Sequence, residues 1–133
     1  MMTIRQFALI FAIACGVGFI WTKYAHARDN GQWENEDPSL RSWYQSLKQP
    51  DNHLVSCCGE ADAYEADIYG MDGDKMVATI TNSRGNPIPE GTKIEIPPNK
   101  ISRDYNPTGH VIVFIGGVAG APYVYCFVMG SGV

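Results

Sequence analysis

The chain has 133 residues, 45% of them hydrophobic, and its formal net charge at pH 7 is −4. This length suits one domain with a single modest hydrophobic core. The acidic balance argues against nucleic acid as a partner, because binding to a phosphate backbone requires clustered lysine and arginine side chains.

The first 27 residues are predicted to be an export signal that is cleaved. Arg5 supplies a positive charge, residues 7–21 form an uncharged apolar run, and Ala25-His26-Ala27 matches a small-residue cleavage site. Removing this segment leaves 106 residues with eight basic and fourteen acidic side chains, a net charge of −6. We therefore expect the mature protein in the periplasm or outside the cell, where disulfide bonds form.

Three other interpretations of this segment stay open. An uncleaved signal would anchor the protein in the inner membrane, although its 15-residue apolar run is short for a bilayer that needs roughly 20 residues. The second interpretation is lipid attachment at Cys15, although the sequence before this cysteine lacks the leucine that such sites usually carry. The third is that the segment forms a buried helix of the fold. After cleavage we expect no stable membrane insertion.

One helix is predicted at the start of the mature domain, after a flexible lead-in at residues 28–36. Asp37 is placed to cap the helix and Pro38 suits its first position, while Pro50 ends it. The apolar side chains at helical spacing predict one buried face, made of Leu40, Trp43, Tyr44 and Leu47.

The rest of the domain, which extends to residue 133, is predicted to be β-structure. Alternation predicts a hairpin of residues 64–68 and 76–80 with an Asp-Gly corner, and then a strand at 92–96. Two continuous apolar runs, 110–115 and 123–128, are typical of strands buried on both faces, joined by a flexible loop at 116–122. We expect a small antiparallel barrel or curled sheet of about five strands, with one N-terminal α-helix and disulfide stabilisation.

The cysteines of the mature chain predict one disulfide between the adjacent pair Cys57 and Cys58 and the distant Cys126. Cys58 is the preferred partner because Gly59 gives its backbone room to turn, and Cys57 is the alternative. Adjacent side chains in an extended segment point to opposite faces, so only one of the two reaches Cys126 easily. The remaining thiol is either buried or available for a disulfide-linked dimer.

Two chemical roles for this segment are weaker hypotheses. A vicinal disulfide between the adjacent cysteines would give a thiol-redox protein, although no nearby basic residue lowers a thiol pKa. A zinc or copper site is the other, although its ligand spacing matches no known signature. Its candidate ligands are His53, Cys57, Cys58, Glu60, Asp62 and His110. We expect no cofactor.

Enzymatic activity is not expected, because the sequence contains no recognisable catalytic motif. Glu65 and Asp67 fit the polar face of an alternating strand. A small hydrolase, or an inhibitor of one, would need a pocket that gathers Glu60, Asp62 and His110.

The chain resembles a group of small exported bacterial proteins of unassigned function. The resemblance rests on Trp43-Tyr44, on the Ser56-Cys57-Cys58-Gly59-Glu60-Ala61-Asp62-Ala63-Tyr64 motif, on Asn106-Pro107-Thr108-Gly109 and on the strand Val124-Tyr125-Cys126-Phe127-Val128. It implies export and a shared fold, and no chemistry. A tail that usually contains proline is replaced here by Met129-Gly130-Ser131-Gly132.

These observations favour a non-enzymatic exported β-domain that acts as an envelope or interaction module. Its expected partner is an unknown protein or envelope component. The competing hypothesis is a periplasmic metal-binding or thiol-redox protein that uses the Cys57-Cys58 segment.

Overall fold

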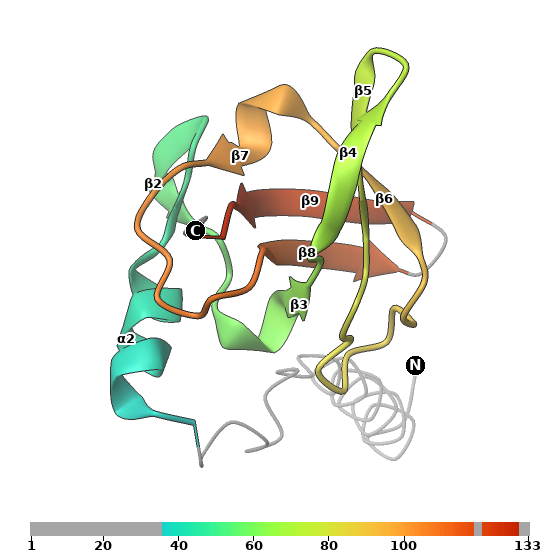
Figure 1. Ribbon diagram of the computed structural model, residues 1–133. Helices are drawn as coiled ribbons and strands as arrows, with labels where there is room; N and C mark the ends of the chain where they lie inside the picture. Colours follow the sequence, from blue (N-terminus) through green and yellow to red (C-terminus); the bar gives the residue numbers. More distant parts are fainter. Residues whose placement is uncertain (1–35, 119–120, 131–133) are drawn as a thin grey trace, which may run out of the picture.

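The structure is a computed structural model that describes residues 36–118 and 121–130 (Figure 1). The predicted signal at 1–27 and all but the last residue of the predicted lead-in lie outside the described residues. Glu36, that last residue, forms an ion pair with Arg84 at 3.3 Å. In the described part of the chain, no helix is both long enough and apolar enough to cross a membrane.

The described chain contains one α-helix, two short 3₁₀ helices and nine strands. In chain order they are α2 (Pro38–Ser46), β1 (Lys48–Gln49), β2 (Asn52–Ser56), η1 (Glu60–Asp62), β3 (Ala63–Glu65), β4 (Ile68–Asp72), β5 (Lys75–Thr79), β6 (Lys93–Ile96), η2 (Pro98–Lys100), β7 (Ile101–Ser102), β8 (Ile112–Val118) and β9 (Ala121–Val128). The prediction of a mainly β fold with one N-terminal helix is confirmed.

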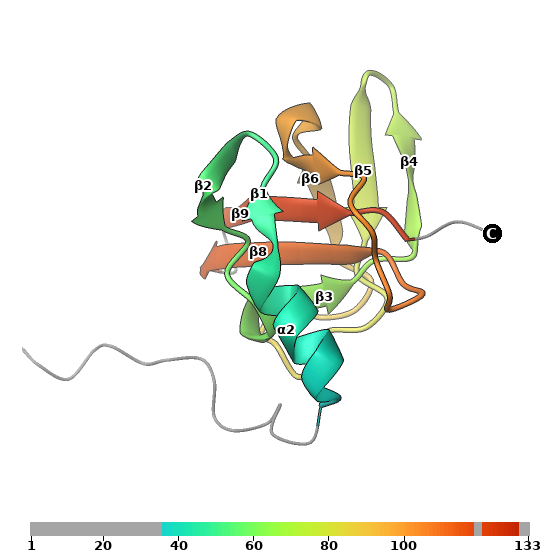
Figure 2. The same cartoon turned by 90° about the vertical axis from the view of Figure 1, so that its left-hand side faces the viewer.

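The strands form three small sheets rather than one, with the orders β1-β2, β3-β8-β9-β7 and β4-β5-β6. Each pair is antiparallel except β7–β9, which is parallel. They do not close into a barrel, and this excludes the barrel that was one of the two predicted architectures. The β8–β9 pair lies between α2 on one side and the β4-β5-β6 sheet on the other (Figure 2).

The helix begins where the sequence predicts and ends earlier. The Asp37 carboxylate accepts a hydrogen bond from the Ser39 N–H at 2.8 Å, which satisfies one of the free donors of the first turn. The last helical residue is Ser46, and the chain is already extended at Leu47, so the predicted end at Pro50 is too late. The apolar face packs as expected, because Tyr44 is buried with its ring 6.1 Å from that of Phe114.

The predicted strand at residues 64–68 is divided between two sheets. Tyr64 in β3 pairs with Val113 of β8, whereas Ile68 in β4 pairs with Thr79 of β5. The chain leaves the first sheet at Ala66, which is fully buried and donates its N–H to the Val111 carbonyl at 2.9 Å. The alternation of apolar and polar residues could not reveal this division, because β3 and β4 both keep the same two-residue period.

The β4–β5 hairpin is confirmed, but its corner is Gly73-Asp74, one residue later than the predicted Asp-Gly corner. Pairing of β4 with β5 runs to Asp72 and Lys75, which leaves Gly73 and Asp74 as a two-residue turn. The φ angle of +65° at Gly73 is one that glycine adopts without steric cost. Glycine at the first central position is the residue that a type II′ turn requires.

The hairpin of β8 and β9 is longer than predicted. Gly116 pairs with Tyr123 and Gly117 with Pro122, so these residues belong to strands and not to a flexible loop. A side chain at Gly116 would overlap the Tyr125 ring, so glycine is needed for close packing there. At Gly116, therefore, glycine reflects a close approach rather than flexibility.

The core consists of two clusters on opposite faces of the β8–β9 pair. Phe114 belongs to the cluster under α2, together with Tyr44. Val113, its neighbour in β8, belongs to the cluster under the β4-β5-β6 sheet, together with Ile96. Successive side chains of a strand point to opposite faces, so burial of both confirms that β8 is covered on both sides.

Candidate functional site

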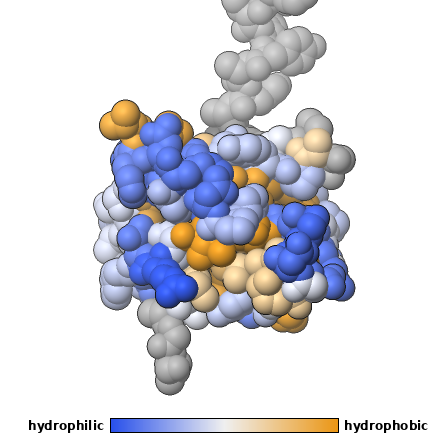
Figure 3. All heavy atoms as spheres, turned by 90° about the horizontal axis from the view of Figure 1, so that it is seen from above, coloured by the Kyte–Doolittle hydropathy of each residue, from blue (hydrophilic) through white to orange (hydrophobic). Residues whose placement is uncertain are grey.

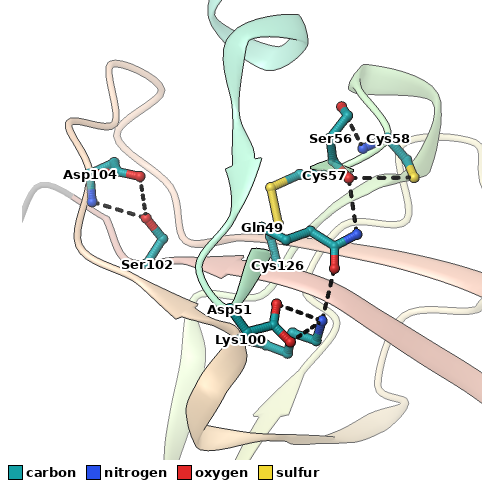
Figure 4. The surroundings of a disulfide bond; sticks show 9 residues. All are labelled: Gln49, Asp51, Ser56, Cys57, Cys58, Lys100, Ser102, Asp104 and Cys126. Atoms are coloured by element: carbon teal, nitrogen blue, oxygen red, sulfur yellow. Dashed lines mark hydrogen bonds and ion pairs between the residues drawn. A yellow bond between two sulfur atoms is a disulfide. The ribbon is translucent and has the colours of Figure 1, made fainter. Parts of the chain in front are cut away.

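The disulfide joins Cys57 to Cys126, whose Cα atoms are 5.6 Å apart (Figure 4). This corrects the preference for Cys58 and selects the partner that was kept as the alternative. The Cys57 N–H donates to the Leu47 carbonyl at 3.1 Å, which holds this residue at the end of the helix, and both bonded cysteines are fully buried. The bond therefore fastens the helix-to-sheet junction to the central strand β9.

Cys58 is a free, exposed cysteine. Its backbone has a φ angle of +83°, and its N–H donates to the Ser56 hydroxyl at 3.1 Å, so the chain turns sharply there. In Figure 4 the Cys58 sulfur points away from the disulfide. Partial burial, and then the negative charge of Asp62, raise the pKa of the Cys58 thiol, although a hydrogen bond with Tyr125 opposes them. A thiol with a raised pKa is a poor nucleophile and a poor metal ligand at neutral pH.

A buried lysine lies beside the disulfide (Figure 4). The Lys100 ammonium donates to Gln49 Oε1 and to Asp51 Oδ1, each at 2.8 Å. Burial acts to lower the pKa of Lys100, but the hydrogen bond with Asp51, together with that of Tyr123 and the Asp51 charge, outweighs it and raises this pKa. The ion pair connects η2 to the β1–β2 hairpin, and no pattern in the sequence had indicated it.

The predicted metal ligands do not assemble as a set. The Cys57 sulfur is used in the disulfide, and His53 lies exposed on β2. Glu60 and Asp62 form η1, where the Asp62 charge acts on Cys58. His110 lies elsewhere, just before β8.

His110 instead meets two carboxylates that the sequence had assigned to the polar face of a strand. Its Nδ1 lies 2.8 Å from Asp67 Oδ2 and 3.9 Å from Glu65 Oε2. The hydrogen bond with Asp67 raises the pKa of His110, against a smaller lowering by burial. The other Asp67 oxygen accepts the Val111 N–H at 2.8 Å.

These three side chains are also the one group with metal-binding geometry among the described residues, since their ligand atoms all lie within 4.8 Å of one another. Both Asp67 oxygens already accept hydrogen bonds, and the Glu65 carboxylate accepts one from Asn82 at 3.2 Å. The contacts therefore describe a histidine–carboxylate pair that fastens the corner between β3 and β4 to the start of β8.

Among the described strands, β4 carries the most exposed large apolar side chains, and it lies at the edge of the β4-β5-β6 sheet. The side chains of Ile68, Tyr69 and Met71 are 65%, 41% and 65% exposed. Apolar side chains on both faces of a hairpin strand were visible in the sequence, but their exposure depends on what packs over them. Seen from above, apolar surface is open between hydrophilic groups (Figure 3).

Two open depressions border this strand. One, of about 470 Å³, lies between β4 and the segment that follows β7, and its lining residues are Tyr69, Arg103, Asp104, Tyr105, Asn106, Met129 and Gly130. The other, of about 440 Å³, lies over the outer face of the sheet and includes Ile68, Val77 and Lys93. In Figure 2, β4 and the segment at 103–110 lie on the same side of the molecule.

Comparisons of this chain with models of known protein families, with curated proteins and with solved structures find no match.

Proposed function

We propose that this protein is an exported, disulfide-stapled binding domain, which acts as an interaction module in the bacterial envelope or outside the cell. The observation that carries the proposal is the exposed apolar strand β4 with a depression on either side. Soluble domains seldom leave contiguous apolar surface open, and those that do often use it to bind another molecule.

Export is supported by the signal-like first 27 residues and by the buried disulfide. Structural disulfides persist in the periplasm and outside the cell and are rare in the reducing cytosol. The expected net charge of −6 for the mature chain supports a protein or an envelope component as partner rather than nucleic acid.

Metal binding or thiol-redox chemistry at the Cys57-Cys58 segment is the alternative, and the free Cys58 is what favours it. Thiol counting and metal analysis of the purified mature protein separate the two functions. One free thiol and no stoichiometric metal are expected for the binding domain, whereas a bound metal that is lost in a Cys58→Ser variant would establish the alternative. The same variant would abolish a disulfide-linked dimer.

Site-specific photo-crosslinking in the producing cells tests the binding function. The photoreactive amino acid is placed at Met71 on β4, and the matched control carries it at Leu54 on β2, which is also apolar and is 93% exposed. A discrete crosslinked product is expected from position 71 and not from position 54. Equal products at both positions, or none at 71, would contradict a binding surface at β4.

Mass spectrometry of the same protein tests export. The expected mature chain begins at Arg28 and contains the Cys57–Cys126 bond with a free Cys58. An intact leader with all four thiols reduced would contradict the proposal.

A further inference from the structure

The backbone of β4 has an open edge. In a two-residue hairpin the residues that flank the turn, here Asp72 and Lys75, exchange backbone hydrogen bonds, and hydrogen-bonded pairs then alternate along the strands. The N–H and C=O groups of Tyr69 and Met71 therefore point away from β5. Within the described residues, no backbone group outside the sheet bonds to either of them.

The side chains beside this edge divide between the two faces of the sheet. Tyr69 lies opposite the buried Ala78, so its side chain is on the core-facing side, where its ring is 5.7 Å from that of Phe127. Ile68 lies on the outer side, with Val77. A further strand along this edge would place alternate side chains in the depression at 103–106 and over the outer face, and this is how sheet edges select peptides.

Edge strands usually carry charged side chains or proline, which prevent unwanted pairing. The opposite edge of the same sheet follows this rule, because Lys93 and Glu95 of β6 are exposed. Between its first residue and Asp72, β4 carries no charged residue and no proline. The absence of such protection at β4 points to an edge that is used.

The charges at the end of β4 indicate which kind of strand could pair with its open edge. The exposed Asp72 and Asp74 lie at the turn end of β4, and no hydrogen bond or ion pair with another described residue engages their carboxylates. Antiparallel pairing of two copies of β4 would bring these carboxylates toward Asp67 of the second copy, which is already paired with His110, so they would meet another carboxylate and gain no unpaired basic partner. A second copy of this acidic chain is therefore a poor partner for the edge of β4, whereas a strand with a basic end is a good one.

We propose that β4 receives an extended segment of a partner protein as an added strand, with alternating apolar side chains and a lysine or arginine next to Asp72. This inference rests on the proposed binding function and specifies its ligand. The added backbone would bond to Tyr69 and Met71, which supplies affinity, and the basic end would set the direction of the segment.

Two synthetic peptides serve as probes. Both alternate valine and threonine, and one is flanked by lysines and the other by glutamates. We expect the lysine-flanked peptide to bind at least about tenfold more tightly at low salt and to lose this advantage at high salt. Binding should also slow hydrogen exchange at the amides of Tyr69 and Met71, measured by NMR.

Two variants with a matched control test the geometry. Met71→Pro removes the outward N–H without removing a bond to β5, and proline is tolerated on edge strands. We expect it to weaken binding of the lysine-flanked peptide at least about tenfold, whereas Met71→Val, which keeps the N–H, should bind within about threefold of the wild type. Asp72→Lys should reverse the preference, so that the glutamate-flanked peptide binds more tightly than the lysine-flanked one. If Met71→Pro does not fold, this variant alone tests strand addition.

Binding of neither peptide, or equal binding by the wild type and Met71→Pro, would overturn strand addition. The crosslinking result at Met71 is independent of these peptides. A partner captured there together with a negative peptide result would leave the binding function intact and refute only this mode of binding.

Discussion

Removing the disulfide with Cys126→Ala is expected to cost a large share of the stability of the domain. The bond closes a loop between residues 69 positions apart. In the chain-entropy treatment, a loop of this length contributes about 4 kcal/mol at room temperature, by restricting the unfolded chain. Because both cysteines are fully buried, loss of the sulfur atom from the packed core adds about 1 kcal/mol. A domain of this size has a total free energy of unfolding of about 5–15 kcal/mol, so the variant should be marginal.

Urea unfolding followed by tyrosine and tryptophan fluorescence measures this loss. Reduction of the wild-type disulfide should reproduce the loop contribution without a cavity, and Cys58→Ala should stay within about 0.5 kcal/mol of the wild type. A loss below about 1 kcal/mol on reduction would refute the idea that the crosslink stabilises the fold by constraining the unfolded chain.

Cys57→Ala adds a test of geometry. It leaves Cys58 and Cys126, and we expect no efficient replacement bond because Cys58 turns away at a φ angle of +83°. A native-like Cys58–Cys126 disulfide in this variant, found by peptide mapping, would refute the conclusion that only one of the adjacent cysteines can reach β9.

Three further predictions concern contacts that the sequence did not reveal. The hydrogen bond with Asp67 raises the pKa of His110 in the folded state, so this pair stabilises the fold fully below the unfolded value of about 6.5 and loses its effect as pH rises through the folded value. Urea unfolding at a series of pH values should show that fall for the wild type and a smaller one for His110→Gln; identical profiles would contradict it. Lys100→Met should lower Tm by several degrees because it leaves Gln49 and Asp51 without their partner, whereas Lys93→Met at an exposed position should leave Tm nearly unchanged. A Tm unchanged in both would show that the buried ammonium contributes nothing. Gly116→Ala should cost about 1–3 kcal/mol because its methyl group would meet the Tyr125 ring, whereas Gly70→Ala, with open space at that position, should be neutral or slightly stabilising. Equal free energies of unfolding for these two variants would show that the Tyr125 ring moves aside freely.

The sequence by itself determined the features that depend on neighbouring residues. The helix begins at Pro38, directly after Asp37, because a capping side chain and a following proline act within one turn. The hairpin turns at Gly73 because a two-residue corner depends on the conformation of one glycine. The continuous apolar run of β8 likewise predicted a strand buried on both faces, because burial removes the need for alternation.

Tertiary structure decided the features that depend on residues far apart in the chain. Cys57 rather than Cys58 meets Cys126 because the Leu47 carbonyl holds Cys57 at the end of the helix. Likewise, the choice of Asp67 as the partner of His110 follows from the passage of the chain between two sheets. Local patterns carry no information on such pairs, because their free energy is gained only when the whole fold brings them together.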